Sequence, residues 1–205
     1  RKIAPPLTLR ALTSSNYANL LVVPSPVSSS PGLAFMLATI AEFGEDGWDE
    51  YWKALKQNGA LVVGDWTEAY YTEFSGSSGK GERPIVVSYG SSPPAEMIFA
   101  SPRPATAPTA VASLTCFRQV EFAGILRGTK HESEAKLLID YLTDLKFQED
   151  LPMTLFVYPA NNNAKLPDDF VKYSLRPESP LQLDPELISR SLLIWLDEFT
   201  NIMLR

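Results

Sequence analysis

Short apolar runs alternate with longer amphipathic stretches along this chain. Residues 20–24, 61–63 and 84–89 are short runs rich in Leu, Val and Ile, and each is followed by polar or turn-forming residues. Such runs are typical of strands buried in a sheet. Because stretches with helical spacing separate them, the pattern predicts an α/β architecture with strands and helices in alternation.

Several segments carry apolar residues at helical spacing. Helices are predicted over residues 33–43, 48–57, 65–74, 133–146 and 187–204, and a further helix begins at residue 95. Trp48, Trp52 and Trp195 lie on the apolar faces of these helices and are expected in the core. The first helix follows a run of serines, so Ser30 is its expected N-cap and Pro31 its first helical residue.

Three further segments complete the predicted organisation. Residues 114–126 alternate in polarity and indicate a strand interrupted at Gly124, and residues 155–158 a short extended piece. Residues 101–113, rich in Pro, Ala and Thr, indicate a connector. The Gly/Ser-rich residues 75–82 indicate a mobile loop.

Composition and charge exclude several functional classes. The net charge is −6 with both signs interspersed, which disfavours a nucleic-acid partner. No apolar run is long enough to span a membrane, and Arg1 and Lys2 do not lead into a signal-peptide core. The sole cysteine, Cys116, is expected to be an inert buried thiol, and the sole histidine, His131, a solvated residue at a helix start.

Known catalytic and metal-binding motifs are missing from the sequence. Gly79-Lys80 lacks the spacing of a phosphate-binding loop, and no zinc-protease, paired-cysteine or calcium-loop motif occurs. A single histidine outside every polar turn offers no nucleophile–base pair. We therefore expect no catalytic residues, no metal ligands and no cofactor, and the chain is predicted not to be an enzyme.

Three polar turns remain as candidate binding elements. Residues 28–32, 64–70 and 88–93 each follow a predicted strand or precede a helix. In open α/β sheets this is where ligands bind, beyond the carboxyl ends of the strands. The turns therefore predict a small-molecule site.

The same turns carry a resemblance to a known family. Residues 28–33 read Ser-Ser-Ser-Pro-Gly-Leu, residues 65–70 Asp-Trp-Thr-Glu-Ala-Tyr, and residues 87–93 Val-Ser-Tyr-Gly-Ser-Ser-Pro. Near the end, residues 156–159 read Phe-Val-Tyr-Pro and residues 166–170 Leu-Pro-Asp-Asp-Phe. In this order the motifs resemble those of the thiamine-binding periplasmic proteins of ABC importers, over nearly the whole chain.

The resemblance implies a type II periplasmic-binding-protein fold, in which two α/β lobes close by a hinge around a ligand cleft. Residues 1–112 would form the second, ligand-binding lobe. Residues 113–205 would form the C-terminal part of the first lobe, whose N-terminal part is absent, so the first lobe is incomplete in this chain.

The function that the resemblance implies is capture of thiamine or its phosphates and delivery to the permease of an ABC importer. The protein would then be exported, as a periplasmic protein or a cell-surface lipoprotein. The alternative is a binding protein of the same fold for iron, a polyamine or a small anion. An iron site would bring Tyr70 and Tyr71 or Tyr89 together on the metal.

Site residues follow from both the chemistry and the resemblance. Trp66 is the best partner for a thiazolium cation, and the serine turn offers hydroxyls and helix N–H groups to an anion. The family's contacts carry over to Ser29 and Tyr89. Two family aromatics are replaced, a Trp by Phe156 and a Tyr by Ala95. The full set of expected ligand contacts is Ser28, Ser29, Ser30, Gly32, Trp66, Tyr70, Tyr89, Ser91 and Phe156.

Overall fold

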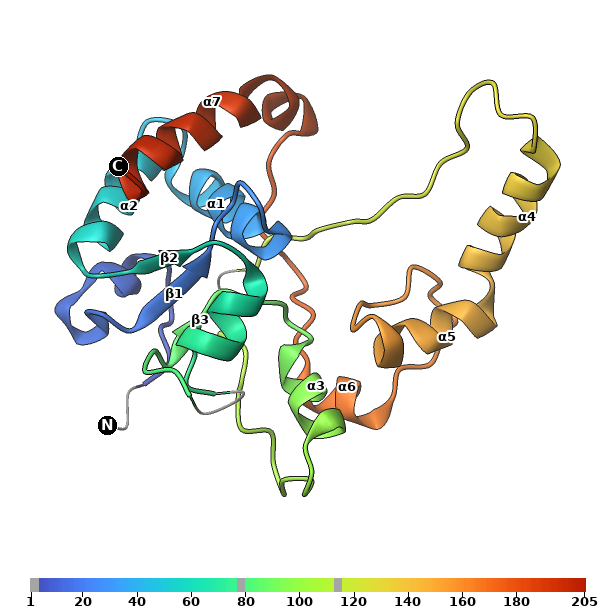
Figure 1. Cartoon of the computed structure of the whole chain (residues 1–205), viewed down its shortest axis with the longest axis horizontal. Coiled ribbons are helices and arrows are strands. Elements are labelled where there is room, and N and C mark those ends of the chain that lie inside the picture. Colours follow the sequence, from blue (N-terminus) through green and yellow to red (C-terminus); the bar gives the residue numbers. More distant parts are fainter. Residues whose placement is uncertain (1–3, 77–79, 113–115) are drawn as a thin grey trace. The chain divides into compact units, whose positions relative to one another are not determined.

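A computed structural model describes residues 4–76, 80–112 and 116–205 (Figure 1). Parts of the expected mobile loop, at 77–79, and of the expected strand, at 113–115, lie outside the described residues. The chain forms two compact units. Unit 1 comprises Arg1–Gly90, Val111–Arg118 and Leu175–Arg205, and unit 2 comprises Ser91–Ala110 and Gln119–Ser174.

Unit 1 is built on a parallel three-stranded sheet. Its strands are β1 (Leu21–Pro24), β2 (Leu61–Val63) and β3 (Ile85–Val86), in the order β2-β1-β3. Val22 of the central strand pairs with Leu61 on one side and Val86 on the other. The three predicted strands are confirmed, although the third is shorter than its apolar run because pairing ends at Val86.

The central strand is buried on both faces, as parallel sheets require. Side chains alternate along it, so Leu21 and Val23 join one apolar cluster and Val22 joins another. The first cluster is shared with α1 (Ser30–Phe43), α2 (Trp48–Gln57) and α7 (Pro185–Met203). The second is shared with the π-helix η3 (Glu68–Glu73).

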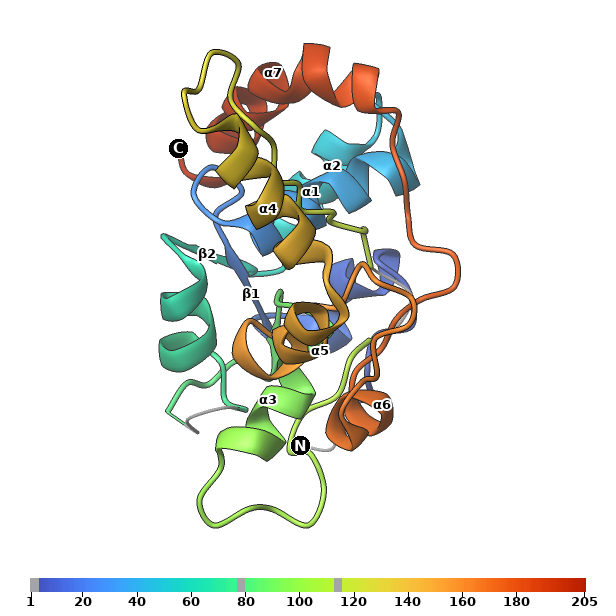
Figure 2. The same cartoon turned by 90° about the vertical axis from the view of Figure 1, so that its right-hand side faces the viewer.

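Tryptophans bind the helical layer together. Trp48, Trp52 and Trp195 are all buried, as predicted. Trp52 makes edge contacts with Phe35 of α1 and Phe199 of α7. Within unit 1, Figure 2 shows α7, α2 and α1 close to one another, and α7 and α2 pack directly against each other. Residues far apart in the sequence therefore close one core over the sheet.

Two short 3-10 helices that the sequence pattern did not predict lead into the sheet. They are η1 (Arg10–Thr13) and η2 (Ser15–Tyr17). The hydroxyl of Tyr51 donates a 2.9 Å hydrogen bond to the carbonyl oxygen of Leu9. This buried bond holds the start of the described chain against α2.

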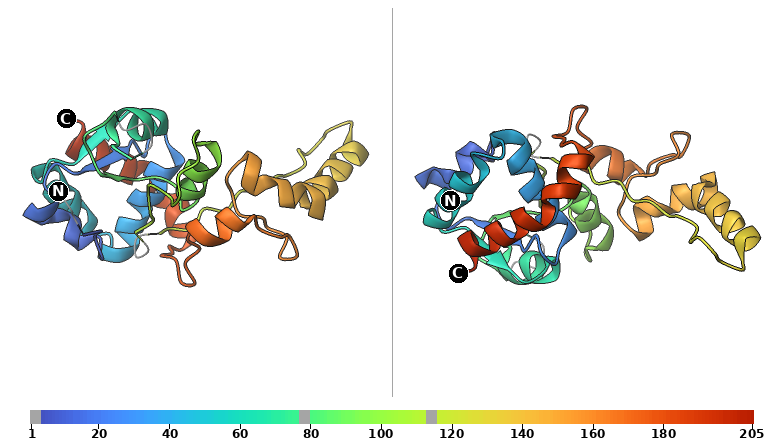
Figure 3. Two further views of the ribbon diagram at one scale, coloured as in Figure 1. Left: turned by 90° about the horizontal axis from the view of Figure 1, so that it is seen from below. Right: turned by 90° about the horizontal axis from the view of Figure 1, so that it is seen from above.

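Unit 2 is helical within its described residues. It contains α3 (Ser92–Phe99), α4 (Glu132–Thr143), α5 (Leu145–Thr154) and α6 (Asp168–Tyr173). Helices α3 and α6 pack against each other, and Phe170 of α6 is fully buried. Helix α4 packs against α5 (Figure 3) but buries none of its own residues.

For residues 114–146, the predicted strand was wrong, and the predicted helix was confirmed except for its end. Among the described residues 116–126, the only pairing is an isolated bridge between Phe117 and Leu181, so no strand forms there. The helix expected over residues 133–146 ends at Thr143, because Asp144 turns extended and caps α5 by accepting from the N–H of Lys146. Helices α5 and α6 were not predicted.

No helix within the described ranges combines the length and the apolar character needed to cross a membrane.

Candidate functional site

The loops that follow the three strands of unit 1 lie at one edge of its sheet, because parallel strands point the same way. The N–H of Ser25, just after β1, donates a 2.8 Å hydrogen bond to the carbonyl oxygen of Val63 at the end of β2. The N–H of Val87, just after β3, donates to the carbonyl oxygen of Val22. All three predicted polar turns therefore begin at this edge.

Side-chain hydrogen bonds tie the first two turns together. The hydroxyl of Ser28 donates a 2.5 Å bond to the carbonyl oxygen of Gly64. The N–H of Gly64 donates a 2.9 Å bond to the Glu68 carboxylate, and the Asp65 carboxylate accepts from the N–H of Glu68. Ser28 therefore uses its donor to hold the neighbouring turn.

The expected capping arrangement of the serine run was wrong by one residue. Helix α1 begins at Ser30, so Ser29 is the N-cap, and Pro31 is the second helical residue. Ser29 does not cap with its side chain. Its hydroxyl is buried and has no hydrogen-bond partner among the described residues. Since buried hydroxyls are almost always paired, this one needs an explanation.

Gly32 brings the start of α1 against the end of β1. A Cβ at this position would lie 2.1 Å from the carbonyl oxygen of Pro24, closer than any real contact. Only glycine fits this approach. The predicted site residue therefore acts through its lack of a side chain, by holding the helix N-terminus beside the strand end.

Trp66 is held by contacts within its own turn, residues 64–70, and with the turn that follows β3. Its indole N–H donates a 2.8 Å bond to the hydroxyl of Ser88, which follows β3. Its ring stacks on Tyr70, with centroids 4.9 Å apart and planes 20° from parallel. Tyr89 approaches the same indole at 6.1 Å with a 55° tilt. The indole therefore has a fixed plane at the strand-end edge.

The tyrosines around Trp66 differ in exposure. Tyr70 is 3% exposed, so it supports the indole from inside, whereas Tyr89 is 43% exposed. Tyr71, which the predicted site omitted, is 47% exposed and contacts both Trp66 and Tyr70 edge-on. Helical spacing could not place Tyr71 beside Trp66, because the contact depends on the π-helical turn of η3.

Two predicted site residues belong to unit 2. Ser91 is buried and is the N-cap of α3, without a side-chain capping bond. Phe156 packs between Phe99 and Phe170, at centroid distances of 5.2 and 6.4 Å. Its φ of 56° is uncommon for an aromatic residue. Ser91 and Phe156 both belong to unit 2, whereas Trp66 belongs to unit 1. That all three contact one ligand therefore stays a prediction.

The remaining chemically notable residues lie outside this edge. Cys116 is half-buried, and burial raises the pKa of its thiol, which agrees with an unreactive side chain. His131 is an exposed residue at the N-cap of α4. Among the residues that the structure describes, no three His, Cys, Asp or Glu side chains cluster as metal ligands would.

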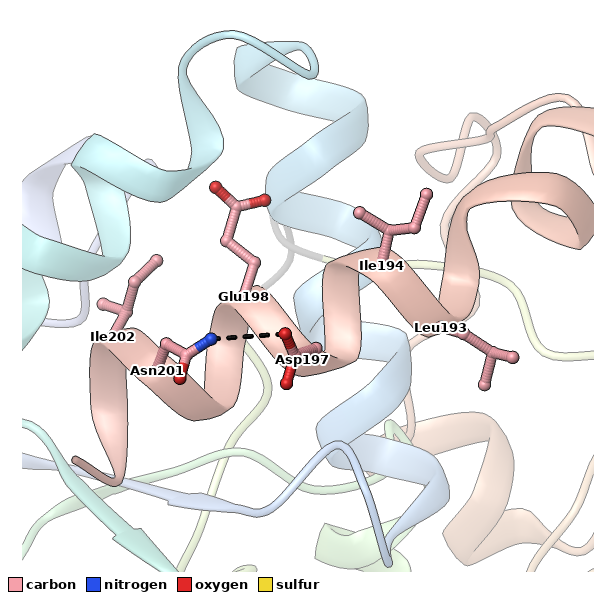
Figure 4. Close-up of a pocket in the computed structure, with 6 residues that line it drawn as sticks. All are labelled: Leu193, Ile194, Asp197, Glu198, Asn201 and Ile202. Atoms are coloured by element: carbon pink, nitrogen blue, oxygen red, sulfur yellow. Dashed lines mark hydrogen bonds between the residues drawn. The ribbon is translucent and has the colours of Figure 1, made fainter.

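A shallow hollow on α7 is not a competing site. The residues that line it all belong to α7 (Figure 4): Leu193, Ile194, Asp197, Glu198, Asn201 and Ile202. Asn201 donates a 3.3 Å hydrogen bond to Asp197 within it. No predicted site residue lines this hollow, and one helix surface offers few converging groups to a ligand.

Comparison with curated proteins finds relatives over nearly the whole chain. The chain is 27% identical over 196 residues to a thiamine-binding periplasmic protein of Brucella melitensis, covering 95% of this chain and 56% of that protein. It is 26% identical over 201 residues to the Escherichia coli thiamine-binding periplasmic protein, covering 98% and 58%. The chain thus spans somewhat more than half the length of these relatives.

Comparison with solved structures confirms the predicted fold class. A periplasmic thiamin binding protein superposes with a TM-score of 0.76 at 23% identity, over 98% of this chain and 60% of the other. The periplasmic binding protein P5PA superposes with a TM-score of 0.65 at 19% identity, over 97% and 62%. The α/β fold is therefore that of periplasmic binding proteins. The family of bacterial extracellular solute-binding proteins matches residues 1–176, and this chain belongs to it.

Proposed function

We propose that this chain captures thiamine or a thiamine phosphate outside the cytoplasm, as the substrate-binding component of an ABC importer. The observation that carries the proposal is the fixed indole of Trp66, which Tyr70 supports and Ser88 orients at the strand-end edge. A flat cation gains about 0.5–2 kcal/mol from an aromatic face of this kind. Thiamine supplies such a cation in its thiazolium ring.

Local charge supports a cation beside Trp66. The carboxylates of Asp65 and Glu68 flank the turn that carries the indole, and both residues are exposed. The start of α1, after the neighbouring strand β1, favours negative charge instead. Ser29 lies there with its buried hydroxyl. A ligand with a cationic ring and an anionic tail, such as thiamine monophosphate, matches both ends.

The remaining parts of the proposal follow from the family. The named relatives are thiamine-binding periplasmic proteins, so we place this chain in the periplasm or at the cell surface, with an ABC permease as its partner. No cofactor or catalytic residue is assigned. The division into lobes stays a prediction: residues 1–112 would form the ligand-binding lobe, and residues 113–205 part of an incomplete first lobe.

Iron, a polyamine or a small anion remains the alternative ligand class on this fold. None of the named relatives favours it. The Tyr70 ring is buried against Trp66 and Phe74, in a position suited to supporting the indole. We therefore retain thiamine as the proposed ligand.

Substitution of Trp66 tests this proposal. In the complete natural polypeptide, Trp66→Ala should weaken thiamine binding by about 1–3 kcal/mol, because the cation–π contact and apolar burial are both lost. Titration calorimetry measures the change, and Trp66→Phe should restore part of it. The exposed neighbour Thr67 provides the control, since Thr67→Ala should leave affinity unchanged. An unaltered Kd in a folded Trp66→Ala protein removes the indole from the site.

A further inference from the structure

We propose that Tyr71 is a further ligand contact, which a π-helical turn brings into the aromatic group around Trp66. This inference rests on the proposed function, because it assigns another residue to the same site. In the sequence, Tyr71 entered only the alternative of an iron site, and neither the family motifs nor the helical spacing marks it as a contact for thiamine.

The π-helical turn explains why Tyr71 reaches Trp66. The N–H of Ala69 bonds to the carbonyl of Asp65, four residues earlier, as in an α-helix. The N–H of Phe74 bonds to the carbonyl of Ala69, five residues earlier, and Glu68–Glu73 is π-helical. A regular α-helix places the residues three and four positions later beside a given side chain. In the wider π-helical turn, the residues four and five positions later take these places. Tyr70 and Tyr71 therefore both contact Trp66.

Burial assigns different roles to the two tyrosines. Tyr70 packs into the cluster with Val22 and Val63 on the sheet, together with Ala69 and Phe74. Tyr71 is not part of that cluster and keeps nearly half of its surface exposed. Its ring lies edge-on to Trp66 at 5.6 Å and to Tyr70 at 5.4 Å. Tyr71 therefore stands at the edge of the Trp66–Tyr70 stack, accessible from solvent.

This arrangement suits a flat cation. Trp66, Tyr71 and Tyr89 present three rings in different orientations, with interplanar angles to the indole of 83° for Tyr71 and 55° for Tyr89. Rings set at an angle contact a bound cation from more than one side, as in aromatic cages. π-helical turns are rare and occur frequently at functional sites. The turn and the exposed ring thus point to the same role.

The test uses a set of Tyr71 variants in the complete natural polypeptide, titrated with thiamine by calorimetry. Tyr71→Phe keeps the ring and should bind within about twofold of wild type. Tyr71→Leu keeps apolar bulk without the ring and should weaken binding about three- to thirtyfold, the range that one cation–π contact supplies. Thr72→Ala, on the same π-helical turn and exposed, is the matched control and should be silent.

The outcomes separate this inference from the function itself. If the wild-type protein binds thiamine and both Tyr71→Phe and Tyr71→Leu bind it with the same affinity, the role of Tyr71 is overturned. The proposed function is not affected by that result. Failure of the wild-type protein to bind thiamine overturns both. Thermal melts of each variant show whether a lost affinity reflects unfolding, and a weakened Tyr71→Leu protein that melts like wild type supports the contact.

Discussion

The three serines at the start of α1, Ser28, Ser29 and Ser30, have hydroxyls in three different environments. Ser28 donates to Gly64 across the turns, Ser29 is buried without a partner among the described residues, and Ser30 is exposed at the first helical position. A buried unpaired hydroxyl costs about 1–3 kcal/mol. A ligand oxygen that accepted a hydrogen bond from Ser29 would remove this cost. The unpaired hydroxyl is therefore consistent with a role in ligand binding.

Replacement of Ser29 should separate stability from binding. Ser29→Ala removes an unpaired hydroxyl, so the free energy of unfolding should stay constant or rise by up to about 1 kcal/mol. Affinity for thiamine monophosphate should fall by about 1.5–3 kcal/mol, the value of a hydrogen bond to a charged group, and affinity for thiamine should fall less. Thermal melts and paired titrations measure both quantities.

Thr67→Ala is the control for this prediction, because Thr67 also carries a hydroxyl, is exposed and is not among the expected ligand contacts. It should change neither quantity measurably. A drop in melting temperature for Ser29→Ala, or an equal loss for both ligands, would mean that Ser29 serves the helix and not the phosphate.

At the residue scale, the type of a side chain was enough to predict a candidate contact, but its position and partners could not be predicted. The aromatic character of Trp66 and the hydroxyls of residues 28–30 were sufficient to mark candidate contacts. The sequence could not show that Ser28 is engaged with Gly64, since the two residues meet only when strands β1 and β2 pair. It could not show Tyr71 either, because the hydrogen-bond register of the helix decides that contact.

At the scale of elements, the junction between β1 and α1 positions the proposed anion-binding end of the site. Gly32 lies in the first turn of α1, and its Cα faces the carbonyl oxygen of Pro24. The approach keeps the helix N-terminus at the strand-end edge. Any side chain at position 32 has to push the helix away from the sheet.

Gly32→Ala tests this junction. A Cβ 2.1 Å from the Pro24 oxygen forces backbone movement, so the free energy of unfolding should fall by about 1–3 kcal/mol, as in overpacked cores. Affinity for thiamine monophosphate should fall as well, because the helix start moves. Denaturant unfolding and titration give the two values. Gly44→Ala serves for comparison, since a Cβ there meets open space, although its φ of 77° still strains an alanine. Wild-type stability in Gly32→Ala would refute the close approach.

Apolar periodicity predicted the elements of unit 1 better than those of unit 2. The three strands and the helices α1, α2 and α7 bury continuous apolar faces, so their patterns are strong. In unit 2 the predicted strand around residue 120 has no partner strand among the described residues, and Phe122 is 90% exposed. An extended segment becomes part of a sheet only when a neighbouring strand supplies hydrogen bonds. Whether such a strand is present cannot be predicted from the sequence of the segment alone.

At the scale of the whole molecule, unit 2 carries apolar surface that nothing described here covers. Leu137, Leu138 and Tyr141 of α4 are each more than half exposed, and α4 buries no residue. Exposed apolar patches of this kind mark interaction surfaces. The chain also spans only 56–58% of the length of the named relatives. The capture of a ligand is accordingly proposed for the complete polypeptide.

The central proposal is that the strand-end edge of unit 1 binds thiamine or its phosphates. The most direct measurement is calorimetric titration of the complete natural polypeptide with thiamine, thiamine monophosphate, spermidine and ferric ion. We predict that thiamine or its monophosphate binds more tightly than spermidine or ferric ion, and that Trp66→Ala abolishes this preference. Tighter binding of spermidine or ferric ion, or no binding of either thiamine compound, would contradict the claim.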